Sequence, residues 1–121
     1  MWAYTDINPC GGGVGDCAVR AVAVATGQSW GNAYLALAKK GYELCDMPSA
    51  NRTWGAYLRE NGFRRENVPD GIHSLRSFCA AFPIGVYVVA MPNHVATVID
   101  GDYYDAWDSG GQEPLYYWRR T

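Results

Sequence analysis

The chain has 121 residues, of which 49% are hydrophobic and 18% are charged, a length and composition typical of one folded domain. Ten basic and twelve acidic residues give a formal net charge of −2, which excludes the strongly basic surface of a nucleic-acid-binding protein and a cationic membrane-binding patch. We therefore expect a single domain over residues 1–121 that binds neither nucleic acid nor membranes.

The N-terminal part is expected to be an irregular entry followed by a helix. Residues 1–16 have no regular pattern and end in the glycine-rich run GGGVGD. A helix is predicted from Cys17, where AVRAVAVAT follows, with Gly15 or Asp16 as its N-cap and Gly27 just after its last turn.

Three more helices are predicted between this helix and the first predicted strand. Ser29 is the expected N-cap of the second helix, which we expect to end at Gly41. The third is predicted over residues 51–61. Ser74 is the expected N-cap of a short fourth helix, which we expect to end before Pro83.

After the fourth helix the apolar pattern favours strands. The four predicted strands are residues 86–91, 94–100, 102–108 and 113–119. Asp100-Gly101 lies between two of them and is a typical hairpin dipeptide. The sequence thus predicts an α+β fold in which N-terminal helices pack on a C-terminal antiparallel sheet of about four strands.

The cysteine pattern argues against a metal site. The four cysteines are Cys10, Cys17, Cys45 and Cys79. They form no CxxC pair, so we expect no structural zinc, and no metal or organic cofactor is implied. No signal peptide is recognisable at the N-terminus, so a cytoplasmic location with reduced thiols is expected.

Cys17 is the candidate nucleophile because it begins a predicted helix. Unpaired backbone N–H groups and the helix dipole stabilise an anion there, which lowers the pKa of a thiol and favours attack on a carbonyl. The backbone N–H of Cys17 would face the resulting oxyanion. Asp16 opposes this effect unless its side chain turns into the helix cap. The alternative is a small buried cysteine with no chemical role.

His94 is the candidate base, and two acids compete to be its partner. A three-residue loop after the His94 strand would place Asp108 directly opposite His94, whereas a two-residue loop would put Asp105 on the face shared with His94. Either carboxylate could orient the imidazole. We favour Asp108, because its predicted strand ends near the start of the His94 strand. The alternative for both acids is a solvated position beside a turn.

A cysteine at the start of a helix, then a histidine on a strand, then an aspartate after the next hairpin is an order that resembles the papain-like cysteine peptidase superfamily. The segments VGDCAVRA (14–21) and NHVATVIDGDYYDAWDS (93–109) are most similar to its small C39-like bacterial and phage-encoded members. The order of elements is similar along nearly the whole chain, but the motifs cover only residues 8–30 and 86–111. The resemblance implies a papain-like fold, with Cys17 as nucleophile, His94 as general base and Asp108 as orienting acid.

One position departs from the family pattern. The superfamily usually has a glutamine five or six residues before the cysteine, which donates to the oxyanion hole, and this chain has Gly11 and Gly12 there. Asn8 is the nearest upstream amide and could complete the hole with the Cys17 backbone N–H.

The resemblance implies a cysteine peptidase that cleaves an amide bond of a peptide or protein substrate through a thioester. A deamidase or acyltransferase would use the same residues. The incomplete oxyanion hole motivates a different class as the alternative: a weakly active or inactive binding protein, such as a phage-encoded inhibitor of a host factor.

Overall fold

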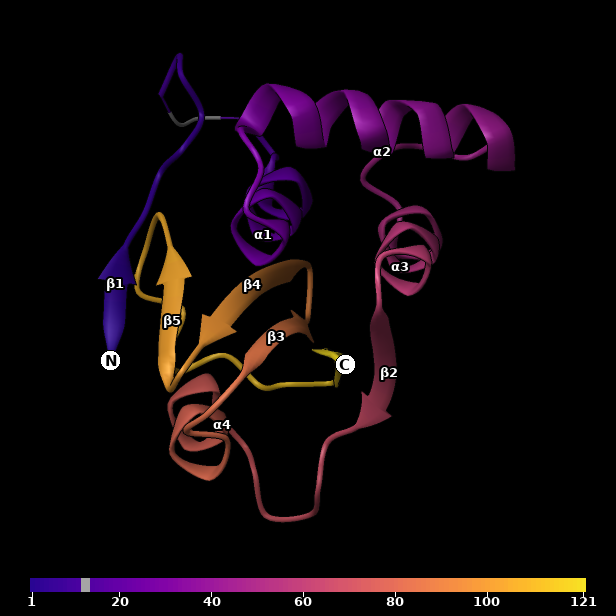
Figure 1. Ribbon diagram of the computed structural model, residues 1–121. Coiled ribbons are helices and arrows are strands. Elements are labelled where there is room, and N and C mark those ends of the chain that lie inside the picture. Colours follow the sequence, from indigo (N-terminus) through magenta and orange to yellow (C-terminus); the bar gives the residue numbers. More distant parts are fainter. Residues whose placement is uncertain (12–13) are drawn as a thin grey trace.

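The computed structural model describes residues 1–11 and 14–121 (Figure 1). Gly12 and Gly13, in the middle of the predicted glycine-rich entry, lie outside the described residues. The helices are α1 (Cys17–Thr26), α2 (Trp30–Leu44), α3 (Asn51–Glu60) and α4 (Leu75–Ala81). The strands are β1 (Trp2–Tyr4), β2 (Phe63–Asn67), β3 (Val86–Met91), β4 (His94–Ile99), β5 (Asp102–Asp105) and β6 (Tyr116–Arg120).

The fold is α+β, as predicted, but the sheet is larger than predicted and mixed. Its six strands run in the order β1-β5-β4-β3-β6-β2. The β1–β5 pair is parallel, and the other four pairs are antiparallel. The expectation of a purely antiparallel sheet of about four strands is therefore wrong at both edges.

The two edge strands were not among the four predicted strands, and neither has a strong sequence signal. β1 is only three residues long and pairs with β5, about a hundred residues later in the chain. β2 has the sequence FRREN, and only its first residue is buried. Strands this short or this polar lack the alternation of apolar residues from which a strand is predicted.

Helices lie on both sides of the sheet, as Figure 1 shows: α1 and α3 pack against one face with α2 over them, and α4 lies on the other face. Alternate residues of β3 enter two separate cores. Val86, Val88 and Ala90 pack with the first three helices, and Tyr87, Val89 and Met91 pack with α4. This alternation explains why every residue of β3 is buried.

Helix α1 is the element that fixes the position of Cys17 against the sheet. Its inward residues are mostly alanines, which let the helix backbone approach β4 closely. Thr97 of β4 donates its hydroxyl hydrogen to the carbonyl of Ala21 at 2.6 Å, and both residues are buried. This bond fixes the position of α1 relative to β4, the two elements that begin with Cys17 and His94.

Three of the predicted helices end close to where they were expected, and one does not. Gly27 follows α1 in the left-handed conformation, with φ of 67°, as predicted. Gly41 was expected to end α2, but α2 continues to Leu44. A Cβ on Gly41 would lie 2.7 Å from the carbonyl oxygen of Asp46. This glycine therefore serves a close backbone approach inside the helix rather than a helix end.

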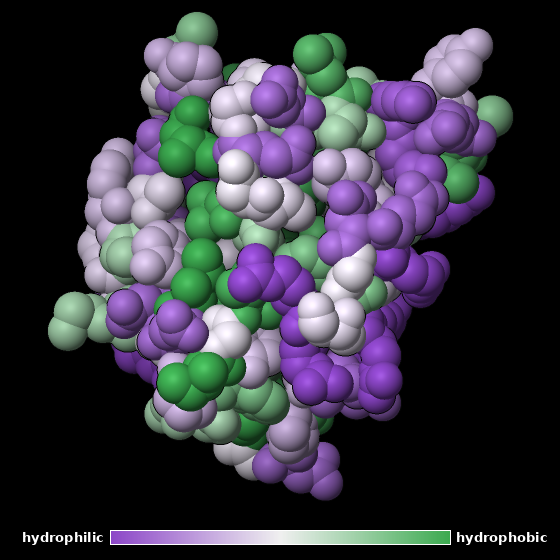
Figure 2. Space-filling view, in the orientation of Figure 1, coloured by the Kyte–Doolittle hydropathy of each residue, from purple (hydrophilic) through white to green (hydrophobic). Residues whose placement is uncertain are grey.

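Polar side chains are unevenly distributed over the surface. In the orientation of Figure 2, hydrophilic residues gather over α3 and β2, where Arg64, Glu66 and Arg119 form exposed ion pairs. In the described ranges 1–11 and 14–121, no helix combines the length and the apolar character needed to cross a bilayer.

Candidate active site

Cys17 is the first residue of α1, and Asp16 occupies the N-cap position before it. The Asp16 side chain does not turn into the helix cap, which was the condition under which its charge would not oppose the thiolate. Its carboxylate instead accepts hydrogen bonds from Trp30 Nε1 at 2.9 Å, Arg20 Nε at 3.0 Å and Asn8 Nδ2 at 3.2 Å. Its negative charge is thus balanced by Arg20 rather than left beside the thiol.

The β4–β5 hairpin determines which acid reaches His94. Thr97 pairs with Tyr104, and Ile99 pairs with Asp102, so only two residues form the loop. Those residues, Asp100 and Gly101, have φ angles of 48° and 84°. Positive φ at both central positions is typical of a type I′ turn, which closes a two-residue hairpin. This is the shorter of the two loops considered for the sequence.

With this register, Asp105 is the residue that meets His94. His94 Nε2 lies 2.5 Å from Asp105 Oδ2. The same carboxylate accepts hydrogen bonds from the Ser109 hydroxyl at 2.6 Å and from the Ala106 backbone N–H at 2.8 Å. The side chain of Asp105 is 2% exposed and that of His94 is 8% exposed, so water competes little for the bond between them.

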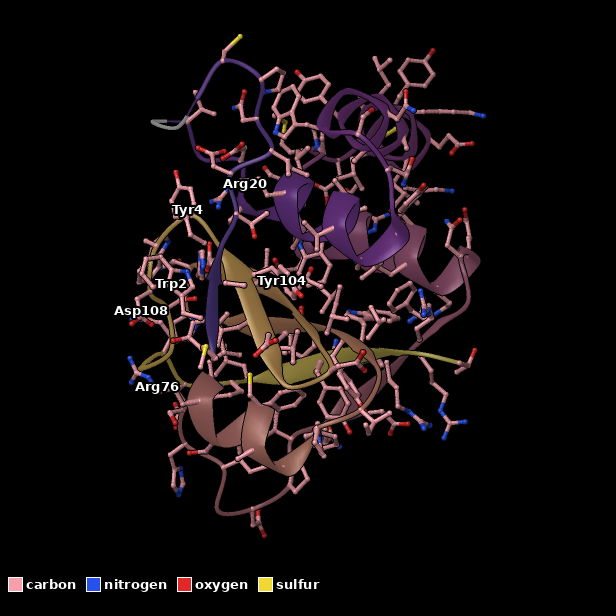
Figure 3. All side chains as sticks on the ribbon, turned by 60° about the vertical axis from the view of Figure 1, so that its left-hand side comes forward. Trp2, Tyr4, Arg20, Arg76, Tyr104 and Asp108 are labelled. Carbon is pink, nitrogen blue, oxygen red and sulfur yellow. The ribbon has the colours of Figure 1, made fainter. Side chains whose placement is uncertain are left out.

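Asp108, the acid favoured by sequence, lies elsewhere. Its carboxylate contacts Arg76 Nη2 at 3.3 Å, and it also accepts from the Tyr103 hydroxyl and from the Gly110 backbone N–H. Figure 3 shows Asp108 beside Arg76 and apart from Arg20. The expected pairing of Asp108 with His94 is wrong, because the strand ends at Asp105 and the chain has already turned away.

Arg20 is the functional-site residue that sequence reasoning missed. It donates from Nε to Asp16 and from Nη1 to Asp105 Oδ1 at 3.1 Å, and its side chain is 14% exposed. One guanidinium thus joins the residue before Cys17 to the acid that holds His94. An arginine four residues after an aspartate, in an otherwise apolar helix, was the available signal.

Trp107 covers the imidazole. Its ring centroid lies 4.7 Å from that of His94, with an angle of 48° between the planes, and 43% of Trp107 is exposed. Trp107 therefore lies between His94 and solvent.

The pairing of Cys17 with His94 changes the acidity of both. Burial raises the pKa of the Cys17 thiol, but the hydrogen bond and charge of His94, the Val95 backbone hydrogen bond and the charge of Arg20 together bring the net pKa below its usual value. Burial lowers the pKa of His94, and the bond to Asp105, with that to Cys17, raises it to about 9. Since Nε2 faces Asp105, Nδ1 is the ring nitrogen left for the thiol.

The acid is held in its ionised form. Burial raises the pKa of Asp105, but the hydrogen bonds from His94, Ser109 and the Ala106 N–H, with the charge of His94, together bring the net pKa below its usual value. Together the three groups favour a thiolate beside an imidazolium that is held by a carboxylate.

Cys17 and His94 open into a cavity of about 300 Å³. Its other lining residues are Gly15, Ala18, Ser49, Asn51, Trp54, Met91, Asn93 and Val95. Cys17 and His94 are therefore the ionisable side chains among the residues that line this cavity. Asn8, the predicted oxyanion donor, does not line this cavity and is bound to Asp16 instead.

Among residues 1–11 and 14–121, no three His, Cys, Asp or Glu side chains are grouped so that they could hold a metal ion.

The chain was also compared with known proteins. A scan against models of known protein families matched none, and searches of curated proteins and of solved structures found no significant similarity.

Proposed function

We propose that this chain is a papain-like thiol hydrolase that cleaves an amide bond of a peptide or protein, with Cys17, His94 and Asp105 as its triad. The observation that carries the proposal is the series Cys17–His94–Asp105, with a half-buried Cys17 and a buried His94–Asp105 pair, at the wall of an open cavity. A nucleophile, a base and an orienting acid in this arrangement suit acyl transfer.

The reaction follows from the protonation states of the pair. The Cys17 thiolate attacks the carbonyl carbon, a C–S bond forms, and the carbonyl π electrons move to oxygen. When this intermediate collapses, the C–N bond breaks and the amine leaves with the proton from His94 Nδ1. Water then attacks the thioester, His94 takes its proton, and breaking the C–S bond restores the thiolate.

The oxyanion requires donors that Asn8 does not supply. Cys17 is the first residue of α1, where backbone N–H groups have no partner within the helix. Asn51, at the start of α3, lines the same cavity, and its Oδ1 accepts from Trp54 Nε1 at 3.2 Å. This bond directs the amide oxygen to Trp54 and leaves the Asn51 N–H groups for a ligand, so Asn51 takes the place proposed for Asn8.

Competitive labelling of the four cysteines tests the proposal. Cys10 and Cys45 are exposed and free, and Cys79 is buried with a pKa raised to about 11 by burial. With limiting iodoacetamide at pH 6, peptide mapping by mass spectrometry should find Cys17 alkylated first, because it alone is paired with an imidazole. Alkylation of Cys10 and Cys45 at least as fast as Cys17 would contradict an activated nucleophile.

The position of Asn8 favours a second candidate function, a binding protein of the same architecture with weak activity or none. Asn8 is not in the cavity, and an oxyanion hole that Asn51 does not complete in its place loses about 3 kcal/mol of transition-state stabilisation. A Cys17→Ala variant that retains full biological activity would favour this candidate over the hydrolase.

A further inference from the structure

Basic side chains gather at one end of the sheet, although the net charge of the chain is −2. The neighbouring elements α3, β2 and β6 carry six of the ten basic residues, namely Arg52, Arg59, Arg64, Arg65, Arg119 and Arg120. The acids on these three elements are Glu60 and Glu66. This is the hydrophilic region over α3 and β2 in Figure 2. The net charge therefore hides a locally basic surface.

A cavity of about 340 Å³ lies within this basic surface, between α3 and the β6–β2 end of the sheet. Three arginines line it: Arg52 and Arg59 come from α3, and Arg65 comes from β2. Its other lining residues are Asn51, Gly55, Ala56, Tyr116 and Trp118. Among the described residues, the wall thus holds three cations and no acidic side chain.

Two of these arginines are held against aromatic rings. Arg65 Cζ lies 3.8 Å from the centroid of the Tyr116 ring, and Arg59 Cζ lies 5.2 Å from that of the Trp118 ring. A guanidinium over a ring uses its face, so the N–H groups in its plane stay free to donate. The Tyr116 ring is itself stacked on the buried Trp54. The two cations are therefore positioned before a ligand arrives.

Arg59 and Arg65 have no acidic partner within residues 1–11 and 14–121. Glu60 is bound to Lys40 instead, with 2.7 Å between Oε1 and Nζ. Glu66 is bound to two arginines that do not line this cavity. The third arginine of the cavity has a side chain 65% exposed and reaches an aspartate only at 4.0 Å. Cations that share a cavity repel each other, and a bound anion offsets that repulsion.

We propose that this cavity binds the phosphoryl group of a phosphate monoester. Such a group carries a charge of about −1.5 to −2 and three acceptor oxygens, which guanidinium groups bind through paired hydrogen bonds. A carboxylate has one charge and two oxygens, and a phosphodiester has one charge, so each matches three arginines less well. The site is separate from Cys17, although Asn51 lines both cavities, and it does not rest on the proposed function.

Isothermal titration calorimetry tests the proposal, at low ionic strength, where exposed charges are least screened. The monoesters are glycerol 3-phosphate and the peptide acetyl-Gly-phosphoserine-Gly-amide. The controls are acetate and the same peptide with an unmodified serine. We expect the monoesters to bind at least tenfold more tightly than acetate, and the unmodified peptide to give no heat of binding. The monoester with the lower Kd identifies the source of the phosphoryl group, a small molecule or a modified protein.

A matched pair of arginine variants locates the site. Arg65→Gln removes a cation from the cavity, whereas Arg64→Gln removes one from the neighbouring position of β2, which does not line it. Arg65→Gln should weaken monoester binding about 10- to 100-fold, because hydrogen bonds between charged groups are lost. Arg64→Gln should weaken it less than about threefold, through the long-range charge alone. Arg65→Lys keeps the charge without the paired hydrogen bonds and should give an intermediate Kd. Circular dichroism checks that the variants fold.

Three results would overturn the proposal. Equal affinities for the monoesters and acetate would show that the cavity does not select a phosphoryl group. Equal losses in Arg64→Gln and Arg65→Gln would show that the basic surface acts as a whole. Binding of a single-stranded oligonucleotide without binding of either monoester would assign the surface to nucleic acid instead. Cys17→Ala should bind the monoesters as the natural protein does, and loss of binding in this variant would place the ligand in the Cys17 cavity.

Discussion

The Asp105 carboxylate is held by groups from four residues of the described chain. His94 and Ser109 contact one oxygen, and Arg20 and the Ala106 N–H contact the other. Each bond fixes the carboxylate in one orientation, so the imidazole it holds is fixed as well. This arrangement makes the identity of the acid testable by substitution.

Asp105→Asn should lower kcat/KM on a peptide substrate by about 10²- to 10⁴-fold, because the amide can neither orient the imidazole in the same tautomer nor stabilise its cation. Asp108→Asn is the matched control and should change it by about twofold or less, since Asp108 contacts Arg76 at the surface. Circular dichroism checks that both variants fold. Equal losses in the two variants would contradict the assignment of Asp105.

Arg20 provides a second prediction at this scale. Arg20→Met leaves the carboxylates of Asp16 and Asp105 buried without their cation, which should reduce the free energy of unfolding by about 3–5 kcal/mol. Arg20→Lys keeps the charge but cannot bridge both acids with a planar group, so it should restore most of the stability and less of the kcat/KM. Urea unfolding and peptide hydrolysis measure the two effects. Full recovery of kcat/KM by lysine would show that charge alone suffices.

At the level of elements, the sequence predicts the helices and central strands well because their signals are local. Ser74 caps α4 by accepting from the Ser77 N–H, and Gly27 ends α1, both as expected. The β1 strand and the extension of α2 through Gly41 depend on contacts between distant or tightly approaching segments. No local pattern of side chains reports such contacts.

The residues of the candidate site likewise divide into those with a local sequence signal and those whose role depends on contacts made in the fold. Cys17 and His94 were predicted from their places at the start of a helix and a strand, and they come together in the fold. The choice between Asp105 and Asp108 depended on a one-residue difference in loop length, which changes the residue facing His94. Arg20 was missed because its two partners become visible only when α1 packs beside the end of β5.

Packing between α3 and β6 gives a prediction about stability. A Cβ on Gly55 would lie 2.9 Å from the buried ring of Trp118, so Gly55→Ala should lower the free energy of unfolding by about 1–3 kcal/mol. Gly31, in α2, has open space at the same position. Gly31→Ala should therefore be neutral or stabilising by up to about 1 kcal/mol. Chemical denaturation of both variants checks the difference, and a stabilised Gly55→Ala protein would contradict this packing.

For the whole molecule, the paired pKa values predict a bell-shaped dependence of kcat/KM on pH. Activity should rise as the Cys17 thiol, whose pKa is lowered, loses its proton. It should fall as His94, whose pKa is raised to about 9, loses the proton that the leaving amine requires. Peptide hydrolysis across pH 4–10 should thus show an alkaline limb near pH 9. Activity that keeps rising beyond pH 10 would contradict the role of His94 as acid.

The most direct test of the central claim is the rate of Cys17 alkylation by iodoacetamide as a function of pH, in the natural protein and in His94→Ala. The account predicts that the natural protein keeps a high rate well below the usual thiol pKa, and that the variant shows a single ionisation shifted to higher pH. Curves that coincide would show that His94 does not activate Cys17, and the proposed triad would be wrong.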